Sequence, residues 1–139
     1  SIMAKLFSFT ICDSINNLAT PTGPVPMLIA PQIALRPQFI PGNFSFAMAI
    51  GMSGINLNIP NNLRLTIHSP DGMIIHNSGE NALPIATKDD LLPAEYQGFM
   101  MCVDVRNLVI PCEGEYAFTF YLNGECVAKQ MVPIFKKVG

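Results

Sequence analysis

Cysteine has the broadest chemistry of any residue type in this chain, and there are four of them: Cys12, Cys102, Cys112 and Cys126. No two form a CxxC pair, and three lie among strand-forming residues. A structural zinc site needs two closely spaced pairs of ligands. We therefore predict four reduced thiols that act mostly as small apolar side chains, with no metal bound.

Two histidines, His68 and His76, are the only imidazoles that could serve as a base, and both fall in one predicted hairpin. The expected register pairs His68 with Ile74 and Thr66 with His76, which places both rings on one solvent face and Ile67 on the core face. Two histidines alone make a poor zinc site. We therefore expect this pair to bind nothing tightly.

The acidic residues offer no clearer site. Asp71, Asp89, Asp90 and Asp104 are too few and too dispersed for a calcium site built from converging loops. The sequence contains no Gly-x-Ser-x-Gly elbow, no phosphate-binding glycine loop and no His-Glu-x-x-His motif. We predict no catalytic, cofactor-binding or metal-binding residue and no cofactor, and we expect that the protein is not an enzyme.

Charge and hydropathy narrow the range of partners. The net charge is −2 and the basic residues are scattered, with only Lys136 and Lys137 adjacent, which argues against nucleic-acid binding. Apolar runs of a few residues fall short of the ~20 that a membrane-spanning helix needs. The first residues lack the pattern of a secretory signal. We expect a cytoplasmic protein whose natural start is Met3, with residues 1–2 a cloning remnant.

The residues without recognisable chemistry are predicted to form short strands along the whole chain. We predict strands at residues 4–12, 27–35 and 43–52, the second of them an edge or bulged strand because of Pro31. Residues 16–26, rich in asparagine and proline, are predicted to form a loop. In residues 43–52, Phe44, Phe46 and Met48 alternate with small residues, as in a strand with one buried face.

Two hairpins have turns whose residue types fit their geometry. Residues 63–68 and 73–76 flank Ser69-Pro70-Asp71-Gly72, where proline presets φ and glycine takes the left-handed position. Residues 114–122 lead into Asn123-Gly124, the two positive-φ positions of a type I′ turn. A long strand is predicted at 98–109. Between residues 77 and 97 we expect no strand and at most one helical turn at 87–92, capped by Thr87.

This pattern predicts one domain over residues 1–139, an all-β antiparallel β-sandwich of seven to nine strands, immunoglobulin-like, with no long helix. Tyr116 follows Gly114 at the entry to a late strand. Sandwiches of this kind place a structural tyrosine there, with its hydroxyl bonded to backbone upstream.

The segment at 5–13, the Ser69–Gly72 turn and the strand from Gly114 into Asn123-Gly124-Glu125 together resemble a family of small uncharacterised bacterial and phage proteins. Members have a short N-terminal strand, an Asp-Gly hairpin in mid-chain and a terminal Gly-x-Tyr hairpin. The resemblance implies an immunoglobulin-like or C2-like sandwich and implies no activity.

The composition favours binding to protein. Only 13% of residues are charged, 50% are hydrophobic, and eight are methionine, which adapts to irregular apolar interfaces. We expect a non-enzymatic protein that binds itself or another protein through an apolar, methionine-bearing surface with a polar asparagine and serine rim. The alternatives are a virion or accessory protein of a phage or mobile element, and a small-molecule-binding sandwich.

Overall fold

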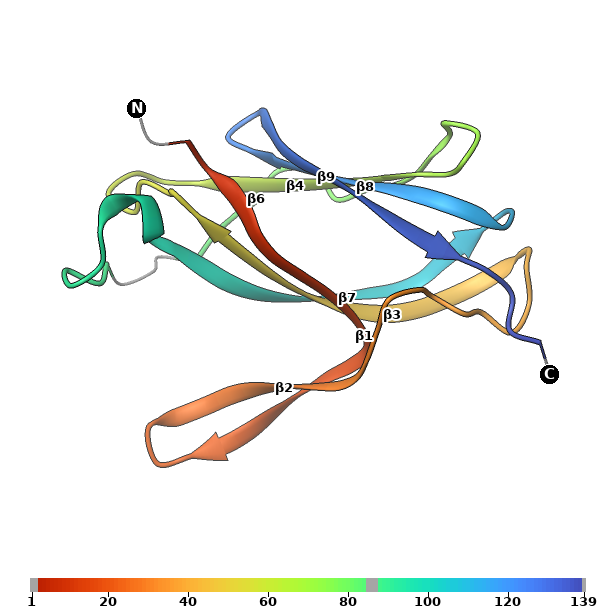
Figure 1. Cartoon of the computed structure of the whole chain (residues 1–139), viewed down its shortest axis with the longest axis horizontal. Coiled ribbons are helices and arrows are strands. Elements are labelled where there is room, and N and C mark those ends of the chain that lie inside the picture. Colours follow the sequence, from red (N-terminus) through yellow and green to blue (C-terminus); the bar gives the residue numbers. More distant parts are fainter. Residues whose placement is uncertain (1–2, 85–87, 139) are drawn as a thin grey trace.

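A computed structural model describes residues 3–84 and 88–138, which form two antiparallel sheets packed face to face (Figure 1). One sheet has the order β2-β1-β3-β7, with bounds Gly23–Gln32, Lys5–Thr20, Gly42–Ser53 and Gly98–Ile110. The other has the order β5-β4-β8-β9, with bounds Ile74–Asn77, Asn62–His68, Gly114–Leu122 and Glu125–Ile134, and the short β6 (Asn81–Ala82) also pairs with β4. The predicted antiparallel sandwich is confirmed.

Aromatic side chains from both sheets fill the core. Phe46 of β3 and Phe118 of β8 lie on the inner faces of opposite sheets, with ring centroids 6.1 Å apart. Phe9 of β1 contacts Phe118 edge-on at 5.9 Å and Phe120 at 5.7 Å. Alternation along β3 and β8 directs every second side chain inward, and these aromatic contacts join the two layers.

Both predicted turns are confirmed. In the first, the N–H of Ser69 donates to the carbonyl of Met73 at 2.8 Å, and Gly72 has φ 89°. In the second, Asn123 and Gly124 have φ 51° and 85°. The side chain of Asn123 also accepts a hydrogen bond from the N–H of Asn62 at 2.8 Å, which ties this turn to β4.

The region predicted as a loop at residues 16–26 is instead a hairpin. β1 does not end near Cys12 but continues to Thr20, where a tight turn leads directly into β2. The prolines misled the prediction, because proline is compatible with an edge strand where its missing N–H would face away from the ladder. β2 is an edge strand, as expected, although it begins earlier and ends at Gln32.

The predicted helical turn lies elsewhere. Its cap, Thr87, falls outside the described residues, and the one short helix of the described chain is the 3₁₀ turn η1 (Ala94–Tyr96). Residues 89–92 form a hydrogen-bonded turn in which the carboxylate of Asp89 accepts the N–H of Leu91 at 3.0 Å. β6 is a short strand in a stretch where none was expected.

Tyr116 closes the corner before β8, as predicted. Its side chain is fully buried, and its hydroxyl donates to the carbonyl oxygen of Cys112 at 2.6 Å. Burial raises the pKa of Tyr116 to about 12. The deprotonated form is therefore disfavoured in the folded chain relative to the unfolded one.

Stability should fall as the pH rises from about 10 to about 12. The unfolded chain releases the Tyr116 proton near pH 10, whereas the folded chain holds it up to about 12. The stabilisation from this group is thus complete below about pH 10 and is lost as the pH rises through the folded pKa. At about 1.4 kcal/mol per pKa unit, the loss reaches about 2–3 kcal/mol.

Urea unfolding followed over this pH range measures the effect. Tyr116→Phe should lack this part of the pH dependence, whereas Tyr96→Phe, which alters a half-exposed ring, should retain it. Equal alkaline losses in Tyr116→Phe and the wild type would contradict the assignment.

Candidate functional site

The two histidines do not share a face, so the predicted register is wrong. His68 pairs with Ile74 as expected, but a β-bulge follows and His76 pairs with Ile67 rather than with Thr66. His76 therefore lines the space between the sheets, with Ile50 and other core residues, whereas His68 lies on the outer face of its sheet. The extra residue of the bulge, Ile75, packs against the core. Because this residue is inserted into the pairing, the side chain of His76 lies on the core face of the sheet and not on the predicted solvent face.

The remaining chemistry-bearing residues are also dispersed. All four cysteines are free; Cys112 is half-buried, and Cys102 and Cys126 are exposed. Cys12 is buried, and this burial raises the pKa of its thiol. The hydroxyl of Ser69 hydrogen-bonds the Asp71 carboxylate and lowers its pKa. Within residues 3–84 and 88–138, no three His, Cys, Asp or Glu side chains come together as metal ligands.

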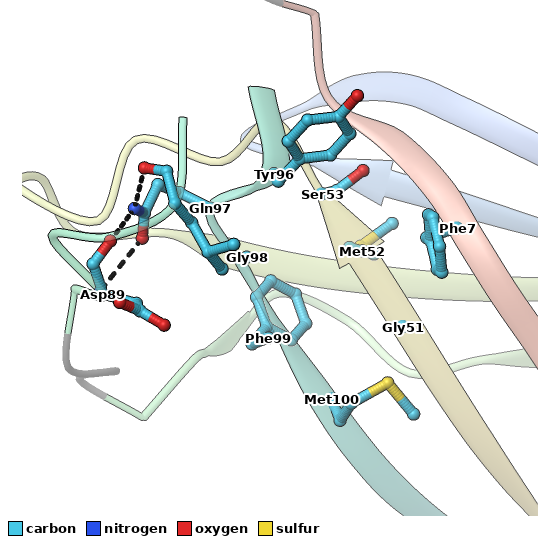
Figure 2. A pocket seen from close by; sticks show the side chains of 11 residues that line it. Phe7, Gly51, Met52, Ser53, Asp89, Tyr96, Gln97, Gly98, Phe99 and Met100 are labelled. Atoms are coloured by element: carbon cyan, nitrogen blue, oxygen red, sulfur yellow. Dashed lines mark hydrogen bonds between the residues drawn. The ribbon is translucent and has the colours of Figure 1, made fainter. Parts of the chain in front are cut away.

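An apolar groove lies on the sandwich body. It lies where β1, β3 and β7 meet the loop before β7, has a volume of about 350 Å³, and is floored by Gly51 and Gly98. Figure 2 shows the side chains of Phe7, from β1, and Met100, from β7, beside the groove, and that of Tyr96 at the end of the groove next to the loop. We call this surface the Phe7 groove and define it by its large side chains, Phe7, Leu92, Tyr96, Phe99 and Met100.

A buried amide organises the loop side of the groove. Gln97 is only 5% exposed; its Oε1 accepts the N–H of Asp89 at 3.1 Å, and its Nε2 donates to the carbonyls of Leu92, at 2.9 Å, and Asp89 (Figure 2). The backbone carbonyl of Gln97 also accepts the N–H of Ile55 at 3.0 Å. Because these bonds are internal, the amide fixes the position of Leu92 and has little hydrogen-bonding capacity left for a ligand.

A break in strand register places the aromatic wall. The pairing of β1 with β3 shifts between Leu6 and Ser8, so that Leu6 and Phe9 pack on the core while Phe7 is 68% exposed. Gly51 leaves room beside it, because a Cβ at that position would lie 2.6 Å from the sulfur of Met100. A bulge and a glycine together open this part of the outer face.

A two-stranded arm extends from the sandwich body (Figure 1, orange). We define the arm as residues 13–30, the parts of β1 and β2 that follow the last pairing of β1 with β3, Cys12 with Ala47. Ala30, at its base, has a left-handed φ of 53°. Three of its large side chains remain substantially exposed: Leu18 (51%), Val25 (40%) and Met27 (42%).

The composition of the arm is as unusual as its position. No residue from 14 to 35 carries a charged side chain. Pro24 and Pro26 alternate along the edge strand and remove backbone donors from it. The arm therefore offers apolar side chains on its faces and few backbone donors along its edge.

Sequence reasoning predicted an apolar, methionine-bearing docking surface and gave no position for it. Met27 lies on the arm and Met100 in the Phe7 groove. The uncharged stretch at 14–35 was a visible signal for the arm. The groove depends on the displacement of Phe7, which the alternation of residues 6–9 leaves ambiguous.

Comparison with known proteins adds no relationship: no protein-family model matches the chain, and no curated protein matches its sequence. Within the described residues, no helix is long and apolar enough to cross a membrane. The interpretation of the arm and the Phe7 groove is therefore based on their geometry and chemistry.

Proposed function

We propose that this protein is a non-enzymatic, self-assembling β-sandwich, and that copies of the chain bind one another through the arm. The observation that carries the proposal is the arm itself. It is a two-stranded ribbon with no charged side chain after Asp13, and Leu18, Val25 and Met27 are exposed on it.

Such a ribbon is poorly stabilised by its own contacts. A two-stranded hairpin is marginally stable in water and needs further strands or a packed layer over one face. In the described chain the arm extends past β3, and its outer edge has no neighbouring strand. Binding to another chain supplies the missing layer and removes the three exposed side chains from water.

The presence of both an arm and a groove favours self-association over the binding of a different protein to one patch. The described residues present both the projecting arm and the Phe7 groove, so each copy can contribute an arm to one contact and a groove to another. A small-molecule binder would instead converge several polar groups on an enclosed pocket. The groove amide, Gln97, bonds its own loop. The proposal also places the protein in the cytoplasm, where free thiols such as its four are kept reduced.

Replacing the three exposed arm residues should abolish self-association. The triple variant Leu18→Thr/Val25→Thr/Met27→Thr places a β-branched, strand-favouring side chain at each position and removes apolar contact area. At micromolar concentrations, light scattering should give a multiple of the single-chain mass for the wild type and the single-chain mass for the variant. The three side chains are proposed to lie at the centre of the interface, so replacing them together should weaken binding about 30-fold or more, the loss caused by a single hot-spot residue.

The matched control is Val109→Thr, which makes the same change at an exposed valine of β7 away from the arm. It should assemble like the wild type. A wild type that is a single chain at every concentration, or a triple variant that keeps the wild-type mass, would refute the proposal.

A further inference from the structure

We infer that the arm of one copy docks into the Phe7 groove of the next, so that assembly is head-to-tail. This inference rests on the proposed function and specifies both sides of the interface. The occupant of the groove is a second copy of this chain, and the docking element is the arm face that carries Leu18, Val25 and Met27.

The strand register places these three side chains together. Leu18 lies directly opposite Val25, and Asn16 lies opposite Met27. Because paired residues share a face and alternate residues along a strand do too, Leu18, Val25 and Met27 form one stripe. The arm thus presents a narrow apolar ridge.

The groove is the concave counterpart of that ridge. Its rim side chains are apolar and largely in water: Phe7 is 68% exposed, Met100 65% and Tyr96 52%. An aromatic side chain buries about 150–250 Å² when fully covered, so Phe7 and Tyr96 alone offer roughly 200 Å² or more to a partner. The volume of about 350 Å³ accommodates side chains rather than a whole strand.

Electrostatics match a neutral partner. The arm has no charge from residue 14 onward, and the only ionisable carboxylate on the groove wall, that of Asp89, already accepts the N–H of Leu91. An anionic partner would find no basic side chain among the groove residues. An uncharged apolar segment loses no solvated charge on entering it.

Reach and edge chemistry favour this mode of docking over strand addition. β1 runs from Asp13 to Thr20 beyond β3, which at about 3.3 Å per residue extends the arm roughly 25 Å from the body. Pro24 and Pro26 leave gaps in the backbone donors of its edge, so a further strand would pair poorly there. The arm must therefore dock through its side chains.

Two unlike surfaces make a heterologous contact, which leaves one free arm and one free groove at the ends of any open assembly. This property allows a complementation experiment. The arm-defective chain is the triple threonine variant, which keeps its groove. The groove-defective chain is Phe7→Asp/Leu92→Asp, which keeps its arm and places two carboxylates where the apolar ridge would sit.

Each variant alone should have the single-chain mass, and an equimolar mixture should form a particle of two different chains. Native mass spectrometry with one chain isotope-labelled distinguishes this heterodimer from either homodimer. Leu91→Asp is the matched groove control, because Leu91 is 93% exposed and does not line the groove. It should assemble like the wild type.

Other outcomes distinguish failure of arm-to-groove docking from failure of self-association through the arm. If the groove variant keeps the wild-type mass while the arm variant dissociates, arms bind each other or another surface, so the inference fails and the proposed function stands. If both variants are single chains and the mixture remains so, the two surfaces do not bind one another, and the inference again fails. If the arm variant keeps the wild-type mass, the proposed function fails as well. Circular dichroism and thermal melting of each variant show whether a variant that has dissociated to single chains is still folded.

Discussion

Phe118→Ala is expected to lower the free energy of unfolding by about 3–5 kcal/mol, a large part of the roughly 5–15 kcal/mol that stabilises an ordinary domain. Phe118 is fully buried in β8 and contacts Phe9 and Phe46 of the opposite sheet. Truncation removes transfer free energy, leaves a cavity and deletes two aromatic contacts between the layers. Urea unfolding monitored by circular dichroism measures the loss.

Two further variants test whether the loss of stability comes from the contact of Phe118 between the sheets. Phe118→Leu retains most of the buried apolar volume and should cost clearly less than the alanine variant. Phe39→Ala removes a ring that is 70% exposed and should change stability by no more than about 0.5 kcal/mol. Equal losses in Phe118→Ala and Phe39→Ala would contradict the assignment of Phe118 to the contact between the sheets.

Gly98→Ala is expected to lower the free energy of unfolding by about 3 kcal/mol, at the upper end of the range for overpacking. Gly98 pairs with Ser53 where β7 begins. A Cβ at Gly98 would overlap the carbonyl oxygen of Met52 and lie 2.8 Å from its carbonyl carbon. Because these atoms belong to the backbone, the clash is relieved only when β3 and β7 move apart under the Phe7 groove.

Gly51→Ala is the matched control on the same groove floor. Its Cβ would meet the side chains of Met100 and Ser8, which can rotate away. It should therefore cost less than Gly98→Ala in the same unfolding measurement. If the two variants are equally stable, the strand spacing at Gly98 is looser than the structure indicates.

The parts of the fold that were predicted correctly depend on local chemistry. Asn123-Gly124 and Ser69–Gly72 specify their turns through the φ preferences of their own residues. Tyr116 reaches a carbonyl only four residues upstream, so its role was also visible in a short window. The alternation in β3 has a strict period of two, which identified its buried face.

The parts that were missed depend on breaks in that periodicity or on distant pairing. A bulge at Ile75 moves His76 to the core side, and another break moves Phe7 outward, yet neither residue differs in type from one in regular pairing. The arm was read as a loop because proline and asparagine are typical of loops. Its strands become recognisable only when their mutual register is known.

The same distinction between local residue chemistry and distant contacts applies to the candidate site. From composition alone the sequence predicted an apolar, methionine-bearing docking surface, which stays a prediction. Its position requires the loop held by Gln97, which bonds residues five and eight positions away. No short motif records that arrangement.

The arm also has a consequence for the order of events as the chain folds. Its pairs are close in sequence, from Thr20 with Gly23 to Ser14 with Ile29, whereas β3 pairs with β7 across a much longer stretch of chain, from Ser53 with Gly98 to Gly42 with Ile110. Hairpins form in about 1–10 μs, while sandwiches dominated by distant pairings fold in milliseconds to seconds. The apolar ribbon is thus expected to exist before the body that anchors it. Pro24 and Pro26 then have a second use, because they limit edge-to-edge stacking of nascent ribbons during the interval in which chains are most prone to aggregate.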